Sequence, residues 1–165
     1  MKKENILVVA LIVVTAGAVF LYNASKSPDR FQGNGSSGST AIAWQPYQEG
    51  LSNARDQGKH VFLYFHAQWC TYCTKLKKYT FPDTRVAALL GEHFISIGVD
   101  TDKNGKIGQE WQVKGLPTMW FLKPDGSRIS SLPGYVDADQ MTRILEYIST
   151  GKYETMSFHE FAAKS

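Results

Sequence analysis

The chain has 165 residues, which suits one domain of ordinary size with a terminal segment to spare. Hydrophobic residues make up 43% and charged residues 20%, a globular balance that excludes a disordered or collagen-like chain. The net charge is only +3 and no block of five like charges occurs, so we expect no nucleic acid as a partner. Two cysteines exclude a disulfide-stapled miniprotein and a zinc site with four cysteine ligands.

The N-terminal segment is strongly apolar. Residues 6–22 carry no charge and follow Lys2 and Lys3. A helix over this run would be slightly shorter than the hydrocarbon core of a membrane, which is about 30 Å thick. The run is therefore long for a signal peptide and short for a membrane span. Residues 16–18 match an A-x-A cleavage pattern, but cleavage there would leave apolar residues at the new N-terminus. We therefore favour a signal anchor over residues 1–22 and keep a cleaved signal peptide as the alternative. Both alternatives export the rest of the chain, and the lysines fit the positive-inside rule.

The remainder of the chain divides into three segments. Residues 23–40 are rich in Ser, Gly and Asn and predict a flexible linker. Residues 41–150 carry the pattern of one α/β domain. Residues 151–165 form a C-terminal extension whose apolar residues we expect to dock as one more short helix. The domain is thus expected on the periplasmic or extracytoplasmic face, anchored in the inner membrane through residues 6–22.

The first half of the domain alternates helical and strand patterns. Apolar residues at helical spacing over 47–57 end at Gly58, and the continuous apolar run over 61–65 predicts a central strand covered on both faces. A helix is expected from Cys70, a second over 84–90, and a second buried strand over 94–99. Helices between these strands imply that the strands are parallel.

The last third of the domain predicts a strand pair and a closing helix. A short helix over 107–111 precedes a strand over 118–122. The turn at residues 124–126 should reverse the chain into an antiparallel strand over 127–131. Asp137 is the expected start of the final helix. The fold class is therefore α/β, with a central mixed sheet flanked by helices.

The chemistry of the chain is concentrated in its two cysteines. Cys70 and Cys73 have the C-x-x-C spacing at the start of a helix, where unsatisfied backbone N–H groups and the helix dipole favour a thiolate. Such placement lowers a thiol pKa from about 8.5 to roughly 3.5–7.5. Cys70 is then the nucleophile, and Cys73, one turn later, resolves the mixed disulfide.

Two other interpretations of the cysteine pair remain open. Half of a metal site would need two more ligands, and no second C-x-x-C or suitably spaced histidines occur. A structural disulfide closing so small a loop would constrain the unfolded chain little. Residues 100–107 resemble the start of a calcium loop, but the acidic residue at its twelfth place is missing and the segment follows a strand, so we expect no metal.

The combination of motifs resembles the thioredoxin superfamily. FHAQWCTYC at residues 65–73, KYTF at 78–81 and GLPT at 115–118 are similar to exported thioredoxin-like reductases and to the C-terminal periplasmic domain of DsbD, a membrane electron transporter. The resemblance implies a thioredoxin-like fold and a cis peptide bond before Pro117. It also implies a substrate site formed by Trp69, Leu116, Pro117 and Thr118, with the redox-active disulfide in place of any cofactor.

The sequence departs from this family at its acidic positions. Tyr64 stands six residues before Cys70, where the family has a buried acid thought to accept the proton of the second cysteine. Lysines at 75, 77 and 78 occupy the region where the DsbD domain has a glutamate. His66 is the candidate that we expect for a proton relay, although a histidine beside an apolar strand is more often a packing residue.

The sequence therefore predicts an exported, membrane-tethered thiol-disulfide oxidoreductase, with reduction favoured over oxidation. Its partners would be disulfide-bearing client proteins and an upstream thiol that donates electrons. A thiol oxidase or isomerase, and a non-catalytic thiol module that binds metal or a client protein, are the alternatives.

Overall fold

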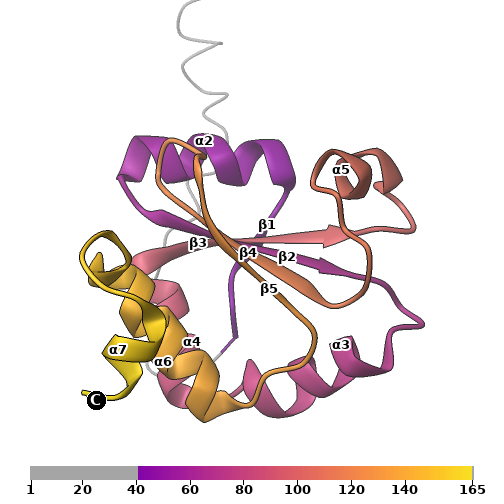
Figure 1. Cartoon of the computed structure of the whole chain (residues 1–165). Helices are drawn as coiled ribbons and strands as arrows, with labels where there is room; N and C mark the ends of the chain where they lie inside the picture. The colour runs from indigo at the N-terminus through magenta and orange to yellow at the C-terminus, as the bar shows by residue number, and fades with distance from the viewer. Residues whose placement is uncertain (1–40, 165) are drawn as a thin grey trace, which may run out of the picture. The chain divides into compact units, whose positions relative to one another are not determined.

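The computed structural model describes residues 41–164, and a five-stranded sheet runs through their centre (Figure 1). The strand order is β1-β3-β2-β4-β5. The strands are β1 (Trp44–Gln45), β2 (His60–His66), β3 (Phe94–Asp100), β4 (Thr118–Leu122) and β5 (Arg128–Pro133). β3 is parallel to both β1 and β2, whereas β4 is antiparallel to β2 and to β5. The predicted mixed sheet is confirmed.

Helices cover both faces of the sheet. They are α2 (Tyr47–Gln57), α3 (Thr71–Lys75), η1 (Leu76–Thr80), α4 (Thr84–His93), α5 (Gly105–Glu110), α6 (Ala138–Ser149), η2 (Lys152–Glu154) and α7 (Phe158–Ala162). α2 and α5 lie on one side, and α3, α4 and α6 lie on the other (Figure 1). The expected helix at Cys70 is correct in position, but its second half, η1, is a π-helix.

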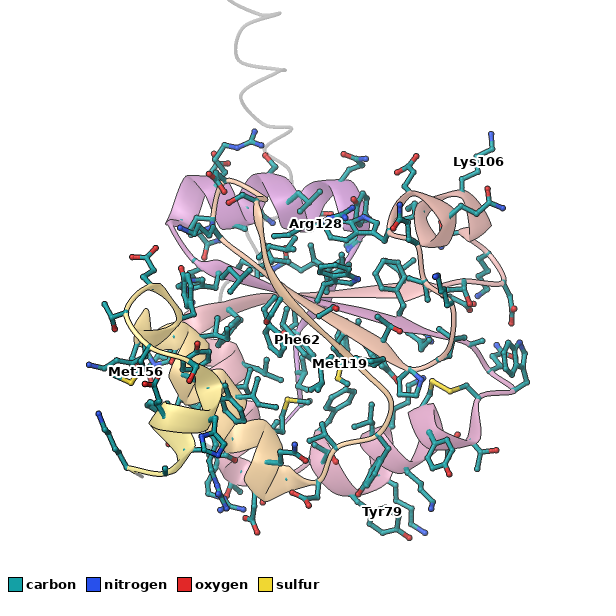
Figure 2. The ribbon with its side chains drawn as sticks, viewed as in Figure 1. Phe62, Tyr79, Lys106, Met119, Arg128 and Met156 are labelled. Atoms are coloured by element: carbon teal, nitrogen blue, oxygen red, sulfur yellow. A yellow bond between two sulfur atoms is a disulfide. The ribbon has the colours of Figure 1, made fainter. Side chains whose placement is uncertain are left out.

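Strand β2 is buried on both faces, as its continuous apolar run predicts. Val61, Leu63 and Phe65 point into the core beneath α2 and α5. Phe62 and Tyr64 point into the other core, beneath α3, α4 and α6. Figure 2 shows Phe62 and Met119 between the sheet and this second layer of helices. Because side chains alternate along a strand, one apolar segment anchors both layers.

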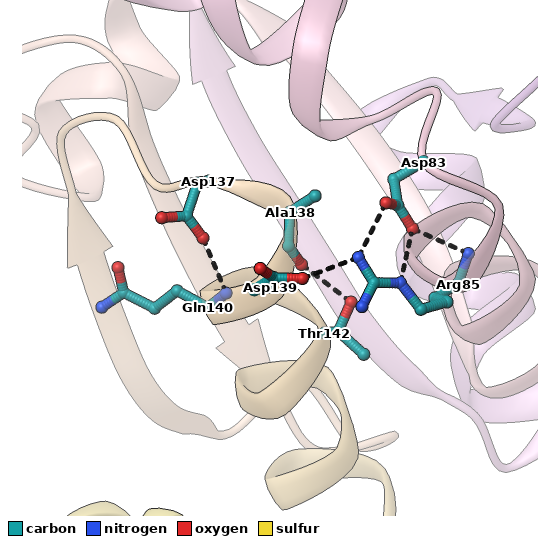
Figure 3. A network of polar contacts seen from close by, with 7 residues as sticks. All are labelled: Asp83, Arg85, Asp137, Ala138, Asp139, Gln140 and Thr142. Carbon is teal, nitrogen blue, oxygen red and sulfur yellow. Dashed lines mark hydrogen bonds and ion pairs between the residues drawn. The ribbon is translucent and has the colours of Figure 1, made fainter.

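Two helix starts are joined by a polar network (Figure 3). The Asp83 carboxylate accepts the backbone amide of Arg85 at the start of α4, and Asp137 caps α6 in the same way. The Arg85 guanidinium bonds Asp83 at 2.9 Å and Asp139 at 2.8 Å, so it connects the two helices. The side-chain hydrogen bonds from Arg85 lower the pKa of Asp83 to about 2. The N-termini of α4 and α6 are thereby held together.

The C-terminal extension packs against α6. The ring of Tyr147 lies 5.4 Å, centroid to centroid, from those of both Phe158 and Phe161. Its hydroxyl donates to the carbonyl oxygen of Met156 at 2.7 Å. Residues 158–162 form the short helix α7, so the extension covers an aromatic face of the domain.

The expected signal segment over residues 1–22 and linker over 23–40 lie outside the described residues. Within residues 41–164, no helix is long and apolar enough to cross a membrane.

Candidate active site

The two cysteines lie where the chain leaves β2 and enters α3. Cys70 is the residue that caps α3, and its Sγ is bonded to that of Cys73 at 2.10 Å. The Cys70 Sγ also accepts the backbone N–H of Cys73 at 3.1 Å. Both cysteines are almost fully buried, with exposed fractions of 4% and 1%. The predicted pair is therefore formed at the predicted helix start.

The hydrogen bond to Cys70 distinguishes the two sulfurs. An N–H that points at a sulfur favours its charged form, and such a bond strengthens when the acceptor becomes a thiolate. The N-terminal end of a helix adds the positive end of its dipole at the same atom. Cys70 rather than Cys73 is thus the sulfur that the backbone stabilises as a thiolate after reduction.

The second component of the site is the loop before β4. The peptide bond between Leu116 and Pro117 is cis, as the sequence resemblance implies. Thr118, the first residue of β4, pairs with Phe65 of β2. This register places Pro117 beside the end of β2, where the chain turns toward Cys70. Leu116 packs against the core cluster that contains both cysteines.

Hydrogen bonds hold this loop in place. The Thr118 hydroxyl donates to the Gly115 carbonyl at 2.8 Å, and the Gly134 amide donates to the Pro117 carbonyl at 2.8 Å. Thr118 is only 7% exposed, so its side chain fixes the loop from inside. Within the described part of the chain, no hydrogen bond uses the backbone of Leu116.

Trp69 directly precedes Cys70, the residue that caps α3. It is 70% exposed, and its indole N–H donates to a carboxylate oxygen of Asp102 at 3.1 Å. Trp69 and Leu116 line one hollow of about 310 Å³. Of the residues predicted to bind substrate, these two are brought together at the surface, while Pro117 and Thr118 lie beneath it.

The segment that resembles a calcium loop has other contacts. Asp102 accepts the Trp69 indole, and Asp100 accepts the backbone amide of Asp102 at 3.0 Å. Among residues 41–164 no group of three or more histidines, cysteines or acidic residues is placed to hold a metal ion. These residues instead anchor the exposed tryptophan beside the disulfide.

Tyr64 and His66 lie on the same face of β2, and Tyr64 belongs to the core cluster that contains both cysteines. Tyr64 is 1% exposed, its hydroxyl has no hydrogen-bond partner, and burial raises its pKa. The His66 ring stacks on Tyr64 at 5.0 Å, and its Nδ1 is also buried without a partner. Burial and, secondarily, the charge of Lys77 lower the pKa of His66. The imidazole is therefore neutral at pH 7 and able to accept a proton.

Two features of the site were not predicted from the sequence. One is the bond between Trp69 and Asp102. The other is the pair formed by Tyr72 and Tyr135, whose ring centroids lie 6.5 Å apart although the residues are far apart in the chain. The sequence offered one signal for this pair: Tyr72 is a large aromatic residue between the two cysteines, at a helix start, where a side chain is open to solvent.

The comparisons with known proteins agree with this arrangement. The family model described as "Thioredoxin-like domain" matches residues 47–149, which is more than half of the chain. The chain belongs to this thioredoxin-like family. The fold and the C-x-x-C disulfide are those of a thioredoxin-like oxidoreductase related to DsbD.

Two curated relatives share the name "Thiol:disulfide interchange protein DsbD". The one from Photorhabdus laumondii is 29% identical over 110 residues, covering 64% of this chain and 19% of the relative. The one from Vibrio vulnificus strain CMCP6 is 35% identical over 108 residues, covering 62% of this chain and 18% of the relative. The chain thus matches less than a fifth of the length of these relatives.

Solved structures show the same fold. A thioredoxin from Thermus thermophilus is 28% identical, with a TM-score of 0.60 over 65% of this chain and 86% of that one. A putative disulphide-isomerase from Bacteroides thetaiotaomicron is 25% identical, with a TM-score of 0.59 over 73% of this chain and all of that one. The predicted thioredoxin-like fold is confirmed.

Proposed function

We propose that this chain is an exported, membrane-tethered reductase of disulfides in client proteins. The observation that carries the proposal is the Cys70–Cys73 pair at a helix start, beside a cis-proline loop whose Leu116 backbone is unpaired among the described residues. Trp69 and Leu116 would contact the client, with Pro117 and Thr118 holding the loop. The partners are then disulfide-bearing proteins and an upstream thiol that restores the reduced state.

The reaction starts from the reduced pair. The Cys70 thiolate attacks one sulfur of a client disulfide, and the other client sulfur leaves as a thiolate and takes a proton. Cys73 then loses its proton, and its thiolate attacks the Cys70 sulfur of the mixed disulfide. The client leaves fully reduced, and the Cys70–Cys73 disulfide forms. Two electrons pass to the client, whose two thiolates take up one proton from Cys73 and one from solvent, and the upstream thiol donor supplies the electrons again.

The limited stabilisation of Cys70 supports the reducing direction. Strong oxidants of this chemistry have a highly stabilised thiolate, which makes their disulfide easy to reduce. Here the Cys70 sulfur accepts a single hydrogen bond from the described residues. We expect equilibration with glutathione to give a potential below about −200 mV, read from the alkylated fraction of each redox form. A value near about −120 mV would instead assign the chain to the oxidants.

His66 is the proposed acceptor of the Cys73 proton. Its neutral imidazole and unpaired Nδ1 lie on the face of β2 that packs against the cysteines, and Tyr64, with its raised pKa, cannot act as a base near pH 7. We expect His66→Gln to slow release of the mixed disulfide by about tenfold at pH 7, since general base catalysis contributes on the order of 10²–10⁴-fold when fully effective. Raising the pH should restore the rate.

The matched control for His66 is Tyr64→Phe. This change removes the buried unpaired hydroxyl and should leave the release rate unchanged while stabilising the fold by about 1 kcal/mol. Stopped-flow measurement of tryptophan fluorescence over pH 6–9 would compare the variants. If His66→Gln releases the client as fast as the original protein at every pH, the relay is wrong.

The membrane tether is the second part of the proposal and depends on residues 6–22. The apolar run is longer than most signal-peptide cores, and its A-x-A site lies too early to remove it cleanly. We expect the full chain to stay in the membrane pellet after an alkaline carbonate wash. A chain lacking residues 1–40 should move to the supernatant. Recovery of a soluble form that starts near Val19 would show that the segment is a cleaved signal peptide.

A further inference from the structure

Two exposed tyrosines flank the disulfide on the side of α3. Tyr72 stands between the cysteines and is 54% exposed, and Tyr135 is 39% exposed. Their ring centroids are 6.5 Å apart, with planes inclined by 33°. Tyr135 directly follows Gly134, whose amide binds the carbonyl of Pro117. The two rings therefore lie where the cysteine loop and the proline loop meet.

The same side of the site carries positive charge without a counterion. The Lys75 ammonium lies 5.3 Å from the centroid of the Tyr72 ring. Residues 71–80 contain three lysines and no acidic residue. None of these lysines forms an ion pair with any of the residues in the described range, whereas Arg85 on the next helix binds two carboxylates. The lysine charges are thus free to interact with a bound molecule.

The segment immediately beyond the cysteines is held rigidly enough to define a binding surface. The buried Thr80 hydroxyl donates to the Val136 carbonyl at 2.7 Å, which ties the end of η1 to the loop that carries Tyr135. Gly134 is tied to the proline loop on the other side. The position of Tyr135 relative to Tyr72 is therefore fixed from two directions, and little ordering is needed on binding.

We infer that Tyr72, Tyr135 and Lys75 form a tyrosine–lysine surface that selects the client, and this inference rests on the proposed reductase function. Its ligand is a client segment with an acidic residue and an aromatic residue beside the cysteine that Cys70 attacks. The carboxylate pairs with the Lys75 ammonium, and the aromatic side chain packs on the two tyrosine rings. Clients with basic flanking residues are repelled by the lysines on the same helix.

A third exposed tyrosine provides an internal comparison. Tyr79 is 57% exposed, and the Lys78 ammonium lies 5.1 Å from its ring centroid. Figure 2 shows Tyr79 at the outer edge of the helical layer, pointing away from the sheet. It has the same chemistry as Tyr72 with Lys75, but it lies about two helical turns beyond Cys73. A change at Tyr79 is therefore a control for the loss of an exposed tyrosine beside a lysine, because it leaves the residues next to the disulfide unchanged.

The experiment uses the full chain, reduced with dithiothreitol and separated from it. Its substrates are four peptides that share one internal disulfide and differ only in the two residues beside the attacked cysteine: Glu-Tyr, Glu-Ser, Lys-Tyr and Lys-Ser. We measure the second-order rate of reduction of each peptide. The Glu-Tyr peptide should react on the order of tenfold faster than the Lys-Ser peptide at low salt, and the charge preference should shrink as salt is added.

Two pairs of variants identify the residues responsible. Lys75→Glu should reverse the charge preference, while Lys152→Glu, the same charge change on η2, should keep it. Tyr135→Ser should remove the preference for tyrosine, while Tyr79→Ser should keep it. The two control variants, Lys152→Glu and Tyr79→Ser, should reduce hydroxyethyl disulfide, which is small and neutral, at the original rate, because the cysteines and the tyrosine–lysine surface are unchanged in them.

The outcomes separate the inference from the function on which it rests. Equal rates for the four peptides, with hydroxyethyl disulfide still reduced, would overturn the tyrosine–lysine surface alone. A Lys152→Glu or Tyr79→Ser effect as large as that of its partner variant would also overturn it. If the original protein reduced neither the peptides nor hydroxyethyl disulfide, the proposed reductase would be wrong, and the inference would fall with it.

Discussion

Replacing Cys70 by alanine should abolish the reduction of client disulfides, whereas replacing Cys73 should stop the reaction halfway. Without Cys70 no sulfur stands at the helix start, where the Cys73 amide stabilises a thiolate. Without Cys73 the attack still occurs, but nothing resolves the mixed disulfide. We therefore expect insulin reduction at the uncatalysed rate for Cys70→Ala, and accumulated protein–client adducts on non-reducing gels for Cys73→Ala.

The control for these adducts is the double variant with both cysteines changed to alanine. It should form none, and dithiothreitol should dissolve those of Cys73→Ala. Substantial insulin reduction by Cys70→Ala would show that Cys73 is the nucleophile. If Cys73→Ala gave no adducts in extracts or with a purified disulfide substrate, thiol exchange through Cys70 would be ruled out.

Most of the fold could be predicted because its signals are local. The apolar run of β2 is buried on both faces, and Asp137 caps α6 at the residue where the sequence placed the start of that helix. The turn at residues 124–126 reverses the chain into β5 as expected. Each of these depends on residues adjacent in the sequence, which a single chain reveals without knowledge of its tertiary contacts.

The features that could not be predicted depend on contacts between distant segments. Strand β1 has only two residues and exists because Trp44 and Gln45 pair with β3. Such a short edge strand leaves no periodic pattern. The close approach of α2 to β3 could not be predicted either. A Cβ atom at Gly50 would come within 2.5 Å of the Ile97 side chain, so this position requires glycine. The sequence shows a glycine in a helix, but not the neighbour that requires it.

The same distinction applies to the candidate site. The C-x-x-C spacing and the GLPT segment predicted Cys70, Cys73 and the proline loop, because these motifs are short and specific. The environment of Tyr64 was not accessible in this way. Its ring lies among those of Trp44, His66 and Phe81, at centroid distances of 5.5, 5.0 and 5.1 Å. A large aromatic residue thus fills the space beneath the helix at the position where the family that the sequence resembles has an acidic residue.

This aromatic layer is the support on which the cysteine helix rests. Phe81 follows η1 directly and packs edge-on against both Tyr64 and Phe62. The helix that carries Cys70 is therefore fixed at its far end by rings rather than by charged groups. Protein interiors are close-packed, so a cavity in this layer would weaken the packing of the helix above it.

Phe62→Ala should consequently cause the largest loss of stability among single truncations in this layer. Phe62 is fully buried, and its ring lies 5.7 Å from Phe121, 6.0 Å from Phe81 and 6.1 Å from Trp44, centroid to centroid. Truncating a buried phenylalanine costs about 3–5 kcal/mol, because apolar contact is lost and a cavity remains. That is a large share of the roughly 5–15 kcal/mol that stabilises a typical domain.

Urea unfolding of the oxidised protein, followed by circular dichroism, measures this loss. The matched control is Phe158→Ala, the same chemical change on α7, where the ring is partly buried against Tyr147. Its cost should stay below about 2 kcal/mol, since a partly buried ring has less apolar area to lose. If Phe62→Ala unfolded within about 1 kcal/mol of the original protein, the layer would have repacked, and the aromatic support of the cysteine helix would be wrong.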